Sequence, residues 1–258
     1  MKFRPCIDIH NGQVKQIVGG SLIDKGDEAD ENFVSKQDAT FYAKLYKESG
    51  LKGGHIILLN PVASPYYQED LEQAFKALLE YPNGLQIGGG ITAENAGGFL
   101  EKGASHVIVT SYVFQNGKIN YENLERLFKV TGRSRLVLDL SCRKKDGQYY
   151  IVTDRWQKFT DEVVTIETLN RLSEYCDEFL IHAVDVEGKA NGIEEELVEL
   201  LGNWTSIPIT YAGGVGSYSD ISLLRKLGQN KLDVTIGSAL DLFGGPMEFQ
   251  EVIRLCNS

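Results

Sequence analysis

The sequence predicts an α/β protein with a (β/α)8 barrel, a TIM barrel, and three observations lead to that prediction. Short apolar runs alternate eight times with longer helical patterns along the 258 residues. The apolar runs show little polar–apolar alternation, which is typical of parallel strands buried on both faces. No long interruption separates the eight units, which favours a closed barrel over an open doubly wound sheet. Because alternation alone does not establish closure, the open sheet remains the alternative.

The strands are predicted from short apolar runs bounded by turn-forming residues. In chain order they are Pro5–Ile9, His55–Leu59, Leu85–Ile87, His106–Thr110, Leu136–Leu140, Phe179–Val184, Pro208–Tyr211 and Asp233–Ile236. The helices are predicted from apolar residues that recur every three or four positions. In chain order they are Asp38–Ser49, Glu69–Glu80, Ala93–Lys102, Tyr121–Val130, Ile166–Tyr175, Glu194–Leu201, Ser219–Leu227 and Met247–Leu255. Ser217 and Ser219 are suited to cap the seventh helix.

Two segments depart from the regular pattern. Residues 19–36 form a long, polar and acidic stretch after the first strand, which we expect to be a loop. Residues 141–164 contain the strand-like Gln148–Val152, followed by the triplet Arg155–Gln157. Both segments follow a strand, on the face where barrels carry their active sites, so a functional role is expected.

The two halves of the chain resemble each other. The matching pairs are Cys6–Ile9 with Val137–Leu140, Ile87–Gly90 with Tyr211–Gly214, and Val109–Ser111 with Ile236–Ser238. In each pair the separation is close to half of the 258 residues. The sequence therefore predicts a single domain, residues 1–258, made of two similar half-barrels at about 1–131 and 132–258.

The duplication places one acid at the end of a strand in each half. Asp8 ends the first predicted strand and Asp139 ends the fifth, so both carboxylates are expected at the barrel mouth from opposite sides. A carboxylate there is costly unless it is paired, hydrated or used in chemistry. Two acids whose surroundings separate their pKa values can act as acid and base in one proton-transfer cycle. We predict that Asp8 and Asp139 are the catalytic residues.

Glycine- and serine-containing turns form a second matched set. They lie after the third and fourth strands in one half and after the seventh and eighth in the other. The residues are Gly89, Gly90 and Ser111 in the first half, and Gly213, Gly214, Gly237 and Ser238 in the second. Such turns can direct backbone N–H groups at an anion. Two opposed phosphate sites are therefore expected, and with them a long, doubly phosphorylated small molecule.

Composition excludes several other classes of function. Lys and Arg total 26 against 36 Asp and Glu, giving a net charge of −10 and a pI near 5.0, with no basic run for nucleic acid. The four cysteines form no C-x-x-C pair, so we expect reduced thiols and no metal site. No stretch approaches the roughly 18 apolar residues of a membrane span, and the N-terminal residues lack a signal-peptide pattern, which predicts a cytoplasmic location.

At this point the motifs resemble one known family over essentially the whole chain. The segments that carry the resemblance are Cys6–Gly20, Leu85–Ile91, Leu138–Lys144, Leu180–Gly188 and Ile236–Gly245. Together they resemble the phosphoribosylformimino-5-aminoimidazole carboxamide ribotide isomerases of histidine biosynthesis, in their eukaryotic-type branch. The resemblance implies an Amadori rearrangement of an aminoaldose to an aminoketose, without metal or cofactor, by a monomer. It implies that Asp8 is the base and Asp139 the acid, although the sequence alone leaves that order open.

The resemblance also implies roles in substrate binding. Gly89, Gly90 and Ser111 would hold one phosphate, and Gly214, Gly237 and Ser238 the other. Trp156 matches a family tryptophan that can stack on the aminoimidazole ring. Arg143 follows Asp139 closely, so it could pair with that acid or grip the substrate.

The sixth strand departs from the family pattern. Residues 182–188 lack the threonine found in many bacterial members and are two residues shorter. Asp185 is our expected substrate-binding acid there, with Glu187 or His182 as alternatives. For His182 we favour a buried core group, since most strand histidines are of that kind. The arginine that often follows the third-strand glycines is also missing, so the nearby phosphate would depend more on backbone amides.

Three other functions remain open at the level of sequence. The first is the cyclase subunit of imidazole glycerol phosphate synthase, a sister barrel with the same paired acids and phosphate turns. The second is a broader isomerase that also accepts phosphoribosyl anthranilate. The third is a non-catalytic barrel that binds a sugar phosphate, which the retention of both Asp8 and Asp139 disfavours.

Overall fold

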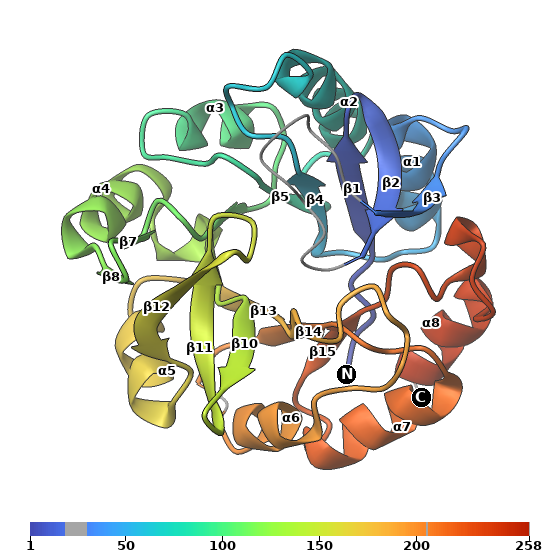
Figure 1. Cartoon of the computed structure of the whole chain (residues 1–258). Helices are drawn as coiled ribbons and strands as arrows, with labels where there is room; N and C mark the ends of the chain where they lie inside the picture. The colour runs from blue at the N-terminus through green and yellow to red at the C-terminus, as the bar shows by residue number, and fades with distance from the viewer. Residues whose placement is uncertain (19–29, 205, 258) are drawn as a thin grey trace.

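In the computed structural model, which describes residues 1–18, 30–204 and 206–257, eight parallel strands form a ring with helices around it (Figure 1). In ring order they are β1 (Cys6–His10), β4 (Gly54–Leu58), β5 (Leu85–Gly88), β6 (Val107–Val109), β9 (Leu136–Asp139), β13 (Glu178–His182), β14 (Ile209–Ala212) and β15 (Asp233–Thr235). Each of the eight strands predicted from the sequence is present, with bounds that differ by one or two residues.

Residues ahead of β1 close the ring. Phe3 forms a parallel bridge with Val234 of β15. On either side of that bridge, the Arg4 N–H donates to the Val234 carbonyl at 2.8 Å and the Val234 N–H donates to the Lys2 carbonyl at 2.9 Å. The last strand therefore pairs beside the first, and the predicted (β/α)8 barrel is confirmed over the open sheet. The division into half-barrels near residue 131 stays a prediction.

Helices cover the outside of the ring (Figure 1). They are α1 (Ala39–Glu48), α2 (Tyr67–Glu80), α3 (Ala96–Glu101), α4 (Tyr121–Thr131), α5 (Ile166–Leu172), α6 (Glu195–Gly202), α7 (Tyr218–Leu227) and α8 (Phe249–Asn257), with short 3-10 turns η1 (Arg133–Arg135) and η2 (Asp241–Phe243). Ser217 caps α7 as predicted, and Asp220 completes the capping box. Within the described ranges, no helix has the length and apolar character needed to cross a bilayer.

Side chains fill the barrel interior in layers. At the N-terminal ends of the strands, Glu178 accepts hydrogen bonds from Gln86 at 2.9 Å and from Thr210 at 2.6 Å. Above this polar layer lies a buried apolar layer, made of Ile108, Val137 and Leu180 with Ile57 packed against it. The main hydrophobic core lies outside the ring, between strands and helices, and includes Ile7 and Ile9 of β1. A site at the C-terminal ends of the strands, above these layers, is the arrangement expected of such a barrel.

Antiparallel strands replace parts of the two segments expected to be irregular. Strand β2 (Gln13–Ile17) pairs with β1, and β3 (Glu31–Val34) pairs with β2. The prediction of a loop over residues 19–36 is therefore wrong for 31–34, because pairing with β2 gives this polar segment a partner. Residues 19–29 lie outside the described part of the chain. A two-stranded hairpin, β7 (Phe114–Gln115) with β8 (Lys118–Ile119), follows β6.

A separate three-stranded sheet stands over the barrel mouth after β9 (Figure 1). Its strands are β10 (Cys142–Lys145), β11 (Gln148–Thr153) and β12 (Lys158–Val163). The predicted strand at Gln148–Val152 is confirmed as β11. The turn between β11 and β12 lies at the mouth, since Trp156 and its neighbours in this turn line the cavity described below.

Candidate active site

A cavity of about 590 Å³ opens at the C-terminal ends of the strands. All eight parallel strands contribute to its wall, through Asp8, Leu58, Gly88, Val109, Asp139, His182, Ala212 and Thr235. Of the residues predicted to form the site, those that line it are Asp8, Gly89, Gly90, Ser111, Asp139, Trp156, Gly213, Gly214, Gly237 and Ser238. The two acids from opposite halves of the sequence therefore face one common space, as the sequence predicts.

Asp8 lies on β1 with its side chain turned into the barrel, opposite in sense to its outward neighbours. One carboxylate oxygen, Oδ2, accepts a hydrogen bond from Nε2 of Gln16 on β2 at 3.1 Å. Burial, and then the negative charge of Glu187, raises the pKa of Asp8 from 3.8 to about 7. A carboxylate with this pKa can both take and release a proton near neutral pH, as a general base must.

Asp139, at the end of β9, is buried in a dense network of donors. Its Oδ1 accepts hydrogen bonds from the Ser141 N–H at 2.9 Å and the Ser141 hydroxyl at 2.8 Å. Its Oδ2 accepts from the Thr110 hydroxyl at 3.1 Å. Burial alone would raise the pKa of Asp139, but the positive charge of His182 and these hydrogen bonds outweigh it and lower the pKa below 3.8. Asp139 is therefore ionised at pH values at which Asp8 still holds its proton.

His182, at the end of β13, is the partner of Asp139. Its Nδ1 lies 3.4 Å from Asp139 Oδ1 and 3.3 Å from the Ser141 hydroxyl. Burial lowers the pKa of His182, but the carboxylates of Asp139, Glu187 and Asp8 outweigh it and raise the pKa to about 9. The ring is buried and hydrogen-bonded, as expected for a core histidine, and it also lines the cavity, so a role as proton carrier stays a prediction. At neutral pH this imidazole carries the proton of the pair.

Trp156 reaches the same network from the turn between β11 and β12. Its indole Nε1–H donates to the Ser141 hydroxyl at 3.0 Å, and its ring centroid lies 5.8 Å from that of His182. Asp154, Arg155 and Trp156 all have φ between 50° and 68°, a left-handed conformation that is costly for three consecutive non-glycine residues. The turn thus holds the indole beside the acids at a conformational cost.

The glycine turns lie on two flanks of the cavity. Gly89 has φ +102°, and a Cβ there would lie 2.2 Å from the Leu58 carbonyl oxygen. Gly214 has φ +77°, and a Cβ there would lie 2.0 Å from the Gly192 carbonyl oxygen. Glycine is therefore required at both turns, by backbone conformation and by close approach. The Ser111 hydroxyl accepts a hydrogen bond from the Asp154 N–H at 3.2 Å, so the first-half turn also contacts the Trp156 loop.

Two amides just ahead of helix α7 are already occupied. Asp220 Oδ2 accepts from the N–H groups of Gly216 at 3.0 Å and Ser217 at 2.9 Å. The candidate anion site on this side is thus formed by the backbone at Gly213–Gly214 and by Gly237–Ser238, which line the cavity.

Arg143 and Asp185 lie elsewhere. The Arg143 Nε donates to Asp185 Oδ1 at 2.8 Å, and the Lys144 N–H donates to Asp185 Oδ2 at 3.0 Å. Both residues lie outside the cavity lining, where their side chains pair with each other. Of the acids considered after β13, Glu187 lines the cavity instead, and burial raises its pKa. We therefore place Glu187 in the candidate site and leave Arg143 and Asp185 out.

Cys6, Gln16 and His55 are among the lining residues that were missed at the level of sequence. Cys6 shares the inward face of β1 with Asp8, so two-residue periodicity could have found it. His55 required knowledge of the register between β1 and β4, and Gln16 required the antiparallel pairing of β2, neither of which the sequence pattern provides.

Comparison with known proteins gives a family model and full-length relatives. The model described as "Histidine biosynthesis protein" matches residues 2–245. A chloroplastic 1-(5-phosphoribosyl)-5-(5-phosphoribosylamino)methylideneamino imidazole-4-carboxamide isomerase of Medicago truncatula is 53% identical, over 100% of this chain and 82% of the plant protein. The isomerase of the same name from Yarrowia lipolytica is 49% identical, over 95% of this chain and 93% of its own. That of Saccharomyces cerevisiae is 44% identical, over 98% and 97%.

Proposed function

The chain belongs to the histidine biosynthesis protein family, and we propose that it is the isomerase that converts the aminoaldose form of the phosphoribosylformimino aminoimidazole carboxamide ribotide into the aminoketose. It is an intramolecular oxidoreductase that interconverts an aldose and a ketose. One observation carries the proposal from the structure. Asp8 and the Asp139–His182 pair face one cavity, with the pKa of Asp8 raised toward that of a base at neutral pH and the proton of the pair held by the imidazole, which equips the site to take and give protons in the same cycle.

The first step needs an acid. Opening of the ribose ring requires a proton on the ring oxygen, and the C1–O bond breaks as the nitrogen lone pair forms an iminium at C1. We assign that proton to the Asp139–His182 pair, in which the two side chains are 3.4 Å apart. Because the pKa of His182 is raised to about 9 and that of Asp139 is lowered, the proton resides on the imidazole. Asp139 would hold the ring in place and stabilise its charge.

The second step needs a base, and Asp8 is suited to it. Its carboxylate would remove the proton from C2, and the C–H electrons would form an enolamine with the former iminium. Return of a proton to C1 and loss of the C2 hydroxyl proton then give the ketone, so the atoms balance without an oxidant. Since only protons move, the proposal includes no metal or organic cofactor. The kcat/KM should rise with pH through about 7 and fall through about 9.

The substrate would span the cavity between the two flanks of glycine turns. One phosphate would rest against Gly89, Gly90 and Ser111, and the other against Gly213–Gly214 and Gly237–Ser238, as described for the cavity wall. The Trp156 indole, fixed by its hydrogen bond to Ser141, would stack on the aminoimidazole. Holding both charged ends positions the sugar between the acids, which is the main contribution of binding to rate.

The proposal extends to the state of the protein in the cell. We propose a monomer of a single domain, residues 1–258 with half-barrels near 1–131 and 132–258, because all eight parallel strands of the barrel line one cavity within a single chain. The four cysteines are free and buried, in keeping with a cytoplasmic location. Sedimentation of the active protein and fractionation of cells would test these two points separately.

The deciding experiment supplies the purified chain with the aminoaldose ribotide and follows formation of the aminoketose. We expect turnover in the wild type, a loss of at least about a hundredfold in Asp139→Asn, and near-normal turnover in Asp185→Asn. The latter is the matched control, because Asp185 pairs with Arg143 away from the cavity.

Two outcomes would replace the proposal with an alternative. Ammonia-dependent cyclisation of the aminoketose would identify the chain as a cyclase, and binding of the ribotide without turnover would identify a non-catalytic barrel. A parallel assay with phosphoribosyl anthranilate reports whether the specificity is broader.

A further inference from the structure

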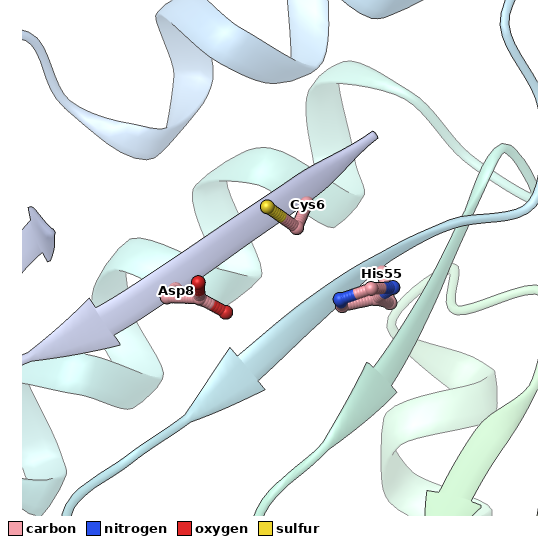
Figure 2. A group of neighbouring side chains, drawn as sticks. All are labelled: Cys6, Asp8 and His55. Carbon is pink, nitrogen blue, oxygen red and sulfur yellow. The ribbon is translucent and has the colours of Figure 1, made fainter. Parts of the chain in front are cut away.

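Three potential metal ligands meet in the floor of the cavity. Cys6 and Asp8 are two residues apart on β1, so both side chains point to the barrel interior. His55 on β4 is directly opposite Cys6 in the parallel register. The sulfur, a carboxylate oxygen and an imidazole nitrogen all lie within 4.8 Å of one another, and Figure 2 shows the three side chains converging from the two neighbouring strands.

This combination of donors is selective in its chemistry. Thiolate, imidazole and carboxylate are the ligands that Zn²⁺ and other late divalent transition metals take, whereas Mg²⁺ and Ca²⁺ take oxygen. Around a tetrahedral Zn²⁺ the ligand atoms are about 3.5 Å apart, so shifts of about 1 Å would complete the geometry. Because all three residues line the cavity, the fourth position would face open space.

The surroundings favour a cation at this point. An imidazole offers a nitrogen lone pair, and a metal bound to the Cys6 thiol would replace its proton. Glu187 lines the same cavity and has a buried Oε2 without a hydrogen-bond partner among residues 1–18, 30–204 and 206–257, so it adds negative charge near the three ligands.

Gln16 contacts two of the three residues, Asp8 and Cys6. Its Nε2 lies 3.1 Å from Asp8 Oδ2 and 3.7 Å from Cys6 Sγ. Groups that touch the ligands in this way orient them and raise metal affinity.

We propose that Cys6, Asp8 and His55 form a binding site for a thiophilic divalent cation such as Zn²⁺, and that the bound cation inhibits the isomerase. The inhibitory half rests on the proposed function. A carboxylate oxygen that coordinates the metal cannot accept the C2 proton, so occupation of the site removes the base. The expectation of no metal site came from spacing along the chain, and it does not cover ligands gathered from two paired strands.

Binding is tested first, without reference to activity. Co²⁺ is added to the purified, reduced full-length chain, and the near-ultraviolet charge-transfer band of a cobalt thiolate is recorded. We expect the band in the wild type, its loss in Cys6→Ala, and its retention in Cys256→Ala, a matched control in which a buried cysteine of α8 is changed. No band in the wild type, or an equal band in Cys6→Ala, would overturn the proposal. Circular dichroism confirms that each variant is folded.

Inhibition is tested second, by titrating Zn²⁺ into the isomerase assay and reversing it with a chelator. We expect His55→Gln and Cys6→Ala to need at least about tenfold more Zn²⁺ for half-inhibition, each measured against its own metal-free rate. Inhibition unchanged in both variants would overturn the inhibitory role. A cobalt band in a chain with no isomerase activity would instead refute the proposed function and leave the metal site standing.

Discussion

Replacing Asp8 by asparagine is expected to stabilise the protein while it abolishes turnover. The pKa of Asp8 is raised from 3.8 to about 7, chiefly by burial. Ionising this carboxyl in the folded protein therefore costs about 4 kcal/mol, since one pKa unit is worth about 1.4 kcal/mol. Asparagine has nearly the shape of the protonated acid and cannot ionise, so Asp8→Asn avoids that cost.

The pH dependence of this gain has a definite sign. The folded state holds the Asp8 proton to about pH 7, whereas the unfolded chain releases it near pH 3.8. The free energy of unfolding of the wild type therefore falls as pH rises across that window. Relative to the wild type, Asp8→Asn should be more stable by about 2 kcal/mol at pH about 5.5, and by about 4 kcal/mol at pH about 8.

The measurement is urea unfolding of both proteins at the two pH values, with turnover recorded on the same samples. Asp139→Asn is the matched control, for which the change in the free energy of unfolding is expected to have the opposite sign. Its pKa is lowered in the folded state, so the wild type gains stability from this ionisation above the unfolded value, and the variant should be less stable at both pH values. An Asp8→Asn variant that is no more stable than the wild type at pH about 8, or whose advantage does not grow between the two pH values, would refute the reasoning.

Three other substitutions test separate parts of the site. Glu187→Gln should lower both apparent pKa values of the pH–rate profile by about one pH unit, because the Glu187 carboxylate raises the pKa of both Asp8 and His182. A profile at unchanged pH would contradict this. Trp156→Phe keeps a ring but loses the bond to Ser141, so kcat/KM should fall about fivefold, for about 1 kcal/mol. Steady-state kinetics that equal those of the wild type would exclude that bond from catalysis. Gly214→Ala, which puts a Cβ 2.0 Å from a carbonyl oxygen, should raise KM at least tenfold and destabilise by about 1–3 kcal/mol, whereas Gly98→Ala, with open space, should do neither.

The sequence was most informative where the two halves repeat. Asp8 and Asp139 could be placed at the mouth because each ends a strand, and strand ends in a barrel meet on one face. The glycine turns were found for the same reason, since Gly89 and Gly214 occupy conformations that other residues avoid. Patterns of this kind depend on local backbone geometry, which nearby residues determine.

The sequence was least informative where a contact joins distant segments. Arg143 is only four positions after Asp139, but β10 turns it toward Asp185 instead. His182 became part of the site through the alignment of β13 beside β9, which brings its ring to the Asp139 carboxylate. Strand register and the direction of a hairpin are properties of the packed structure, so a motif alone could not supply them.

The layers inside the barrel have a consequence for the fate of the C2 hydrogen. Beneath the cavity, the apolar layer of Ile57, Ile108, Val137 and Leu180 and the polar layer around Glu178 separate Asp8 from bulk water on that side. We therefore expect solvent and substrate to reach Asp8 by the same entrance, so that a bound ribotide would stand between Asp8 and the outside. Deuterium placed at C2 should accordingly reappear in part at C1 of the ketose, and complete wash-out into water would show that another route connects Asp8 to the solvent.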